Sequence, residues 1–159
     1  MGTLFVVATP IGNLKDITMR AIETLKGADV IICEDTRVTS KLLAHLEIEN
    51  KSLIALNDYN ESFKIREIVP IIERENLVAL VSDAGTPLIS DPGFKLVREC
   101  LNLGIKVVSV PGPSSVVAAL SISGLPTDKF LFLGFLPQKY GHRQKMLENV
   151  KGINEIIKQ

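Results

Sequence analysis

The chain has 159 residues and a formal net charge of zero. This length suits one compact domain and is short for two. With 46% hydrophobic and 23% charged residues, the composition is that of a globular protein and excludes an intrinsically disordered chain. The balanced charge argues against a protein that binds nucleic acid through bulk charge alone.

The charges are not evenly distributed along the chain. The first 136 residues include thirteen basic and sixteen acidic ones, whereas from Pro137 onward five basic residues stand against two acidic ones. The sequence therefore has an acidic body and a basic C-terminal stretch.

Cys33 and Cys100 are too few for a disulfide framework, and neither belongs to a spacing typical of a metal site. The first eight residues lack the positive region of a signal peptide, and their apolar stretch is too short to span a membrane. We therefore expect a cytoplasmic protein that has no structural metal.

Short apolar runs rich in β-branched residues recur along the chain and predict five strands. These strands cover 4–8, 30–33, 52–56, 77–81 and 106–110, and helices are predicted over 19–26, 61–75, 94–103 and 115–123. Apolar strands that alternate with helices are typical of a parallel sheet covered on both faces. Because a closed eight-unit barrel needs roughly 250 residues, we expect an α/β fold with an open, doubly wound, mainly parallel five-stranded sheet.

The pattern changes after Gly124. Residues 130–135 are consistent with one more strand, and 137–141 with a linker. The apolar residues from 146 to 157 predict a final helix, whose apolar face has no obvious partner.

Ligands of an open parallel sheet bind beyond the carboxyl ends of its strands. The segments that follow the five predicted strands are 9–14 (TPIGNL), 34–37 (EDTR), 57–61 (NDYNE), 82–93 (SDAGTPLISDPG) and 111–115 (PGPSS). They include no dinucleotide fingerprint, no P-loop and no nucleophile elbow. Loops rich in Gly and Pro expose backbone groups, which suit a neutral or zwitterionic ligand better than a polyphosphate.

Taken singly, each loop has an ordinary structural explanation. The segment 111–115 is consistent with a turn followed by a helix cap, and Asp83 and Asp91 with turn formers. Glu34-Asp35 with Arg37 is consistent with a local ion pair, and the basic stretch 139–145 with a solvated linker. The convergence of five such loops on one edge favours a ligand site.

Four of the loops also carry a resemblance to a known family. The segments 9–18, 34–37, 82–93 and 111–114 are similar, in this order, to those of the tetrapyrrole methylase superfamily, and in particular to its branch that acts on small-subunit ribosomal RNA. The resemblance implies transfer of a methyl group from S-adenosylmethionine to a cytidine 2′-hydroxyl of the 16S rRNA. It also implies a homodimer of two-domain chains with the cofactor in the cleft between the domains.

The resemblance carries site residues with it. The implied cofactor-binding residues are Ile11, Gly85, Thr86, Ile89, Ser114 and Ser115. Gly85-Thr86-Pro87 stands where the superfamily commonly has Gly-Asp-Pro, a departure that fits the rRNA branch and weakens any role carried over from that Asp.

The predicted reaction needs a base, because a ribose hydroxyl is a poor nucleophile at neutral pH. The candidate carboxylates are Glu34, Asp35, Asp58, Asp83 and Asp91. We select the Glu34-Asp35 pair as catalytic, with Arg37 either binding RNA phosphate or orienting a carboxylate. Lys139, Arg143 and Lys145 are the candidate RNA contacts.

The resemblance implies that residues 1–125 form the S-adenosylmethionine-binding domain. Residues 126–159 are then a connector and the start of a second domain that this chain lacks. Three alternatives stay open: methylation of a tetrapyrrole or another small molecule, a fragment that binds cofactor or a second copy without catalysis, and a metal-dependent phosphatase built on the carboxylates.

Overall fold

The structure is a computed structural model that describes residues 2–151. The chain divides into two compact units, Met1–Thr127 and Asp128–Gln159. The roles assigned to residues 1–125 and 126–159 remain predictions.

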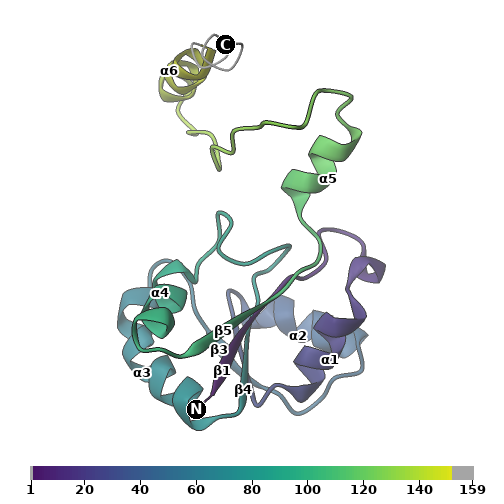
Figure 1. Ribbon diagram of the computed structural model, residues 1–159, viewed down its shortest axis with the longest axis vertical. Helices are drawn as coiled ribbons and strands as arrows, with labels where there is room; N and C mark the ends of the chain where they lie inside the picture. Colours follow the sequence, from purple (N-terminus) through teal and green to yellow (C-terminus); the bar gives the residue numbers. More distant parts are fainter. Residues whose placement is uncertain (1, 152–159) are drawn as a thin grey trace. The chain divides into compact units, whose positions relative to one another are not determined.

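The first unit is built on one five-stranded sheet in which all strand pairs are parallel (Figure 1). The strands are β1 (Thr3–Val7), β2 (Val30–Cys33), β3 (Ser52–Ala55), β4 (Leu77–Leu80) and β5 (Lys106–Val110), in the order β3-β2-β4-β1-β5. The predicted open, parallel five-stranded sheet is confirmed, and each predicted strand agrees with the observed bounds to within one residue.

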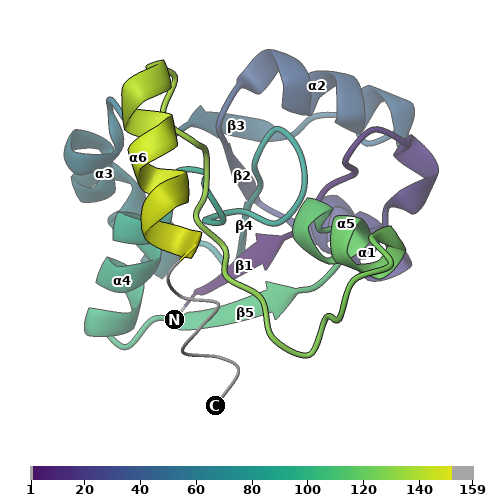
Figure 2. The same ribbon diagram turned by 90° about the horizontal axis from the view of Figure 1, so that it is seen from above.

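Helices cover both faces of the sheet, as predicted (Figures 1 and 2). The helices of this unit are η1 (Leu14–Asp16), α1 (Met19–Gly27), α2 (Thr36–His45), α3 (Glu61–Arg74), α4 (Phe94–Asn102) and α5 (Ser115–Ile122). One apolar core lies between the sheet and the helices α3 and α4, and it includes Ile68 and Leu96. A second core on the α1 and α2 face includes Leu25 and Leu43.

Polar residues at the helix starts explain where α1 and α2 begin. Thr18 Oγ1 accepts a hydrogen bond from the Ala21 N–H at 3.0 Å, and Asp35 Oδ1 accepts one from the Arg37 N–H at 2.8 Å. Both are N-cap contacts that satisfy a free donor of the first turn. No range was predicted for α2, and its first turn includes Thr36 and Arg37 of the Glu-Asp-Thr-Arg segment.

The start of α4 is capped by a residue of another helix. Its N-cap position is Gly93, which has φ 118° and no side chain to accept a hydrogen bond. Glu61, the first residue of α3, is 3% exposed and accepts from the N–H groups of Lys95 at 2.9 Å and Leu96 at 3.1 Å. The end of the loop 82–93 is therefore anchored to α3.

The strand order puts the point where ligands of open parallel sheets bind at the centre of the carboxyl edge. Neighbouring strands β1 and β4 send their chains to opposite faces of the sheet, β1 toward α1 and β4 toward α4 (Figure 1). Such a divergence opens a crevice between the two following loops. These loops are 9–14 and 82–93, two of the predicted site segments.

The second unit includes one described helix, α6 (Tyr140–Lys151). The strand predicted at 130–135 is wrong: residues 128–139 form neither helix nor strand, and Phe130, Phe132 and Phe135 are exposed. A strand needs a neighbouring strand for its hydrogen bonds, and an apolar run alone does not supply one. The final helix begins at Tyr140 rather than at Met146, so it includes part of the predicted linker. Residues 152–157 of that prediction lie outside the described residues.

No helix within residues 2–151 has the length and apolar character needed to cross a membrane.

Replacing Glu61 by Ala is expected to lower the free energy of unfolding by about 1–3 kcal/mol, because two N–H groups of α4 lose their acceptor. Urea denaturation measures the loss. Glu67→Ala, at an exposed position of the same helix, is the matched control. Equal losses in the two variants would contradict the assigned cap.

Candidate functional site

The loops after β1 and β4 are joined by a reciprocal pair of backbone hydrogen bonds. The Thr9 N–H donates to the Gly85 carbonyl at 2.9 Å, and the Gly85 N–H donates to the Thr9 carbonyl at 3.1 Å. The Thr9 hydroxyl also donates to the Ser82 carbonyl at 3.2 Å, and Thr9 is 1% exposed. The two loops therefore form one rigid element at the crevice.

Three of the predicted cofactor residues meet at this element. A Cβ on Gly85 would lie 3.2 Å from Ile11 Cγ2, and Gly85 has φ 83°. The Thr86 hydroxyl donates to the Pro113 carbonyl at 3.2 Å, which connects the loop after β4 to the loop after β5. Ser114 occupies the N-cap position of α5 and Ser115 is its first residue, whereas Ile89 is half-exposed in the loop 82–93.

The loop 82–93 has an unusual backbone. In addition to Gly85 and Gly93, Leu88 and Ser90 have positive φ values of 74° and 64°. Leu88 is held in this conformation because its side chain packs against the core on the α3 and α4 face. Side chains that hold a rare backbone conformation are typical of ligand-binding loops.

The Glu-Asp-Thr-Arg segment places its two carboxylates in different environments. Asp35 caps α2 and accepts from the Arg37 guanidinium, with Nε and Oδ1 3.0 Å apart. These hydrogen bonds, first from the side chain and then from the backbone of Arg37, lower the pKa of Asp35 to about 2. Such a carboxylate is a weak proton acceptor at neutral pH.

Glu34 differs from its neighbour in charge environment. Its partial burial raises the pKa of the carboxyl, and the nearby charge of Asp83, followed by those of Asp91 and Asp58, raises it further. The pKa of Asp91 is also raised, first by burial and then by Asp83 and Asp58. Of the predicted catalytic pair, Glu34 is thus the better proton acceptor.

The acidic residues beyond β2, β3 and β4 are not arranged as metal ligands. Within residues 2–151 no group of three His, Cys, Asp or Glu side chains is positioned to hold a metal ion. Both cysteines are buried, and this burial raises the pKa of the Cys33 thiol. Burial also raises the pKa of the Cys100 thiol, to about 11. Neither thiol has the lowered pKa of a nucleophile.

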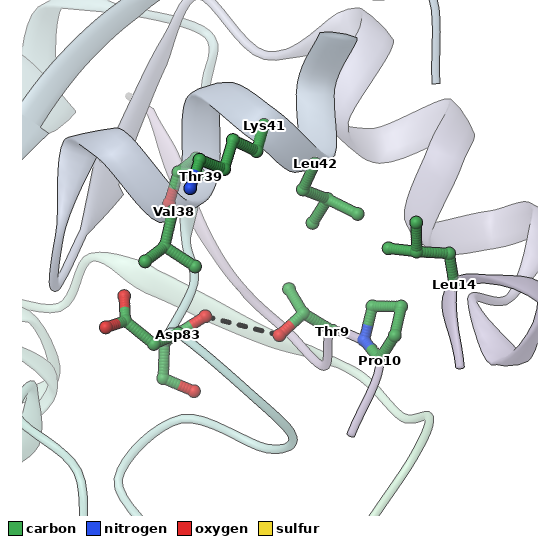
Figure 3. A pocket seen from close by; sticks show the side chains of 9 residues that line it. Thr9, Pro10, Leu14, Val38, Thr39, Lys41, Leu42 and Asp83 are labelled. Carbon is green, nitrogen blue, oxygen red and sulfur yellow. Dashed lines mark hydrogen bonds between the residues drawn. The ribbon is translucent and has the colours of Figure 1, made fainter. Parts of the chain in front are cut away.

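A cavity of about 190 Å³ lies between α2 and the paired loops (Figure 3). Its lining residues are Thr9, Pro10, Leu14, Val38, Thr39, Lys41, Leu42, Ser82 and Asp83. Figure 3 shows Val38 reaching from α2 toward Asp83 at one end of the cavity, Leu42 reaching toward Thr9 and Pro10, and Leu14 at the other end. The α2 residues were missed by the sequence analysis, although Val38 and Leu42 have the four-residue spacing of one helix face.

The predicted RNA contacts belong to the second unit. The Arg143 N–H donates to the Lys139 carbonyl at 3.0 Å, and the Arg143 guanidinium lies over the Tyr140 ring, 5.8 Å from its centroid. Lys145 is on the same helix, but residues two apart do not share a helix face. Lys139 and Arg143 are thus brought together, with Tyr140 beside them.

Comparisons with known proteins identify the family to which the chain is similar. The family described as Tetrapyrrole (Corrin/Porphyrin) Methylases matches residues 3–157. The chain is 48% identical to "Ribosomal RNA small subunit methyltransferase I" of Thermotoga maritima, over 99% of this chain and 70% of that protein. It is 54% identical to the protein of the same name from Rickettsia prowazekii, over 97% of this chain and 55% of that protein.

A solved structure is also similar. A uroporphyrin III C-methyl transferase from Thermus thermophilus matches 85% of this chain and 58% of its own, with a TM-score of 0.58 and 25% sequence identity. The chain spans about half the length of most of the relatives named here.

Burial and neighbouring charges raise the pKa of Glu34 in the folded chain. Its ionisation therefore lowers the free energy of unfolding at pH values above the usual pKa of a glutamate. Glu34→Gln is therefore expected to raise the free energy of unfolding at pH 7, by less than about 1 kcal/mol since partial exposure screens the charge. The gain should vanish below about pH 4, where Glu34 is protonated in both states. Urea denaturation at both pH values checks this, with the exposed Glu23→Gln as control. A gain that does not depend on pH would contradict the electrostatic origin.

Proposed function

Because the chain belongs to the tetrapyrrole (corrin/porphyrin) methylase family, we propose that it forms the S-adenosylmethionine-binding part of a methyltransferase acting on small-subunit ribosomal RNA. The observation that carries the proposal is the meeting of Ile11, Gly85 and Thr86 at the crevice between β1 and β4. The proposed acceptor is the 2′-hydroxyl of a cytidine.

The paired loops fit the proposed cofactor. S-adenosylmethionine is zwitterionic in its methionine part, and loops rich in Gly and Pro suit such a ligand. The absence of a side chain at Gly85 allows Ile11 to lie close to the loop after β4, because a Cβ there would be only 3.2 Å from Ile11 Cγ2. The segment from Pro113 to Ser115 adds two hydroxyls at the start of α5. When bound, this cofactor supplies a methyl group that is already activated by its sulfonium. The protein's part is then to align the acceptor and exclude water.

Glu34 is the proposed proton acceptor. Burial and the neighbouring charge of Asp83 raise the pKa of Glu34, whereas Arg37 lowers that of Asp35, so Glu34 takes a hydroxyl proton more readily than Asp35. The Arg37 guanidinium holds the Asp35 carboxylate and is itself 85% exposed. We therefore assign Arg37 to orienting Asp35, with an exposed side that an RNA phosphate can approach.

Ribosomal RNA is favoured over a tetrapyrrole as the substrate. The sequence identity of the chain to the proteins named as ribosomal RNA methyltransferases is about twice its identity to the uroporphyrin enzyme. The basic residues Lys139 and Arg143 beside Tyr140 combine cations for phosphate with an aromatic ring for base stacking. Methyl transfer to small ribosomal subunits, compared with uroporphyrinogen, distinguishes the two substrates.

Two further parts of the proposal follow the family resemblance. We propose that the protein acts in the cytoplasm, where ribosomal subunits are found, and that two copies associate. The helix α5, Ser115–Ile122, includes no buried residue and so provides an apolar surface for association. A monomeric mass by light scattering would contradict the dimer.

Calorimetry with S-adenosylhomocysteine tests the cofactor site. Gly85→Val is expected to abolish binding, because its Cβ would lie 3.2 Å from Ile11 Cγ2 and so displace Ile11, another of the proposed cofactor residues. Gly104→Val is the matched control, since Gly104 also has positive φ but faces open space. Glu34→Gln should bind the product normally yet lose methyl transfer to small ribosomal subunits. Full binding by Gly85→Val would refute the site, and full activity of Glu34→Gln would refute the base.

Removal of the Arg143 guanidinium tests the RNA contact. Arg143→Ala is expected to weaken binding to a small-subunit rRNA fragment and to reduce the salt slope, d log K/d log[salt], by about 0.7–1. Arg66→Ala, at an exposed position of α3, removes an equal charge and should leave the slope unchanged. Filter binding at several salt concentrations measures both. An unchanged slope in Arg143→Ala would assign α6 to a linker.

A further inference from the structure

The cavity beneath α2 is separate from the predicted cofactor residues. None of Ile11, Gly85, Thr86 and Ser114 lines it, although Thr9 belongs both to its wall and to the bridge with Gly85. We propose that this cavity is a specificity site, which receives the pyrimidine base of the acceptor nucleotide. Asp83 then selects cytosine over uracil. The inference rests on the proposed function and names a binding site for its substrate.

The size of the cavity matches a single ring. Its volume is about 190 Å³, whereas sites for whole drug-sized ligands have roughly 300–1,000 Å³. A cavity of about 150 Å³ in another protein holds a benzene ring. The space therefore suits a six-membered heterocycle and is too small for an entire nucleoside cofactor.

The walls of the cavity suit the two surfaces of a base. Val38 and Leu42 on one side and Pro10 on the other provide apolar contacts for the ring faces (Figure 3). Leu14 closes one end with another apolar side chain, and the Asp83 carboxylate lies at the opposite end. A flat ring with a polar edge is the ligand shape that such a lining accommodates.

The hydrogen-bonding state of Asp83 supports a choice between bases. Its Oδ1 accepts from the Asp35 N–H at 3.1 Å, which fixes the carboxylate. Among the side-chain hydrogen bonds of residues 2–151, none uses Oδ2 of Asp83, so this oxygen is available to a ligand. Cytosine presents an amino group at position 4 that donates to a carboxylate, whereas uracil presents a carbonyl oxygen that a carboxylate repels.

The position of the cavity also suits the acceptor. Asp83 lies two residues before Gly85, and Asp35 follows Glu34, so the same short segments form the cavity wall, the proposed cofactor loop and the proposed base. Lys41 at the rim provides a cation for the phosphate of the same nucleotide. A base held here brings its own ribose toward these segments.

The test compares cytidine and uridine monophosphates as probes. Titration of the ¹⁵N-labelled chain, followed by amide chemical shifts, is expected to move the signals of Val38, Thr39, Lys41 and Asp83 with CMP, and to give at least about fivefold weaker binding of UMP. Asp83→Asn keeps an oxygen for the Asp35 N–H and replaces the free oxygen by an NH₂ donor. This variant is expected to reverse the preference and to bind UMP more tightly than CMP.

Two more variants complete the design. Asp16→Asn removes one charge from the loop after β1 without touching the cavity lining, and its preference should equal that of the original chain. Val38→Phe fills the cavity and is expected to abolish CMP binding while S-adenosylhomocysteine binds as before. The amide spectra themselves report whether each variant is folded.

The outcomes separate this inference from the proposed function. Three outcomes would each overturn the base site: CMP does not move the cavity signals, Asp83→Asn keeps the original preference, or S-adenosylhomocysteine displaces CMP. In each case, binding of S-adenosylhomocysteine would still support the proposed function. Loss of cofactor binding with a retained CMP preference would instead count against the proposed function alone.

Discussion

The candidate site depends on the two backbone hydrogen bonds between Thr9 and Gly85. Beyond the carboxyl ends of β1 and β4 the sheet no longer pairs the chains, so loops leaving toward opposite faces would otherwise be independent. The reciprocal pair continues the pairing by one step, now antiparallel, and the buried Thr9 hydroxyl adds a third bond to Ser82. Buried backbone groups that are paired in this way are costly to separate. The same hydrogen bonds consequently fix the positions of both the proposed cofactor loop and the cavity wall.

A second theme is that adjacent carboxylates differ in chemistry. Asp35 is neutralised by Arg37 and serves the fold as a helix cap, whereas Glu34 lies among acidic neighbours that disfavour its charge. Environments that move two pKa values in opposite directions are typical of sites where one group is structural and another transfers protons. The residue types in the segment 34–37 do not reveal this division. It follows from the start of α2, which orients one side chain toward the helix and leaves the other at the crevice.

The strands and the site loops were predictable because they depend on local patterns. Buried parallel strands have continuous apolar runs, and ligands bind beyond their carboxyl ends. Other features required spatial information. The insertion of β4 between β1 and β2 pairs Thr9 with Gly85, and Glu61 caps a helix more than thirty residues away along the chain. The apolar run at 130–135 suggested a strand, yet without a neighbouring strand it has no hydrogen-bonding partner.

The anchoring of the loop 82–93 at both ends has a consequence for its evolution. Its beginning is fixed by the bridge to Thr9, and its end by the contact of Glu61 with α4. Between these points Leu88 reaches the core only through a left-handed backbone, so the number of residues is matched to the span. We expect related chains to vary exposed side chains such as Ile89 more freely than the loop's length. The number of residues from Ser82 to Gly93 thus fixes the distance between the two anchored ends of the loop.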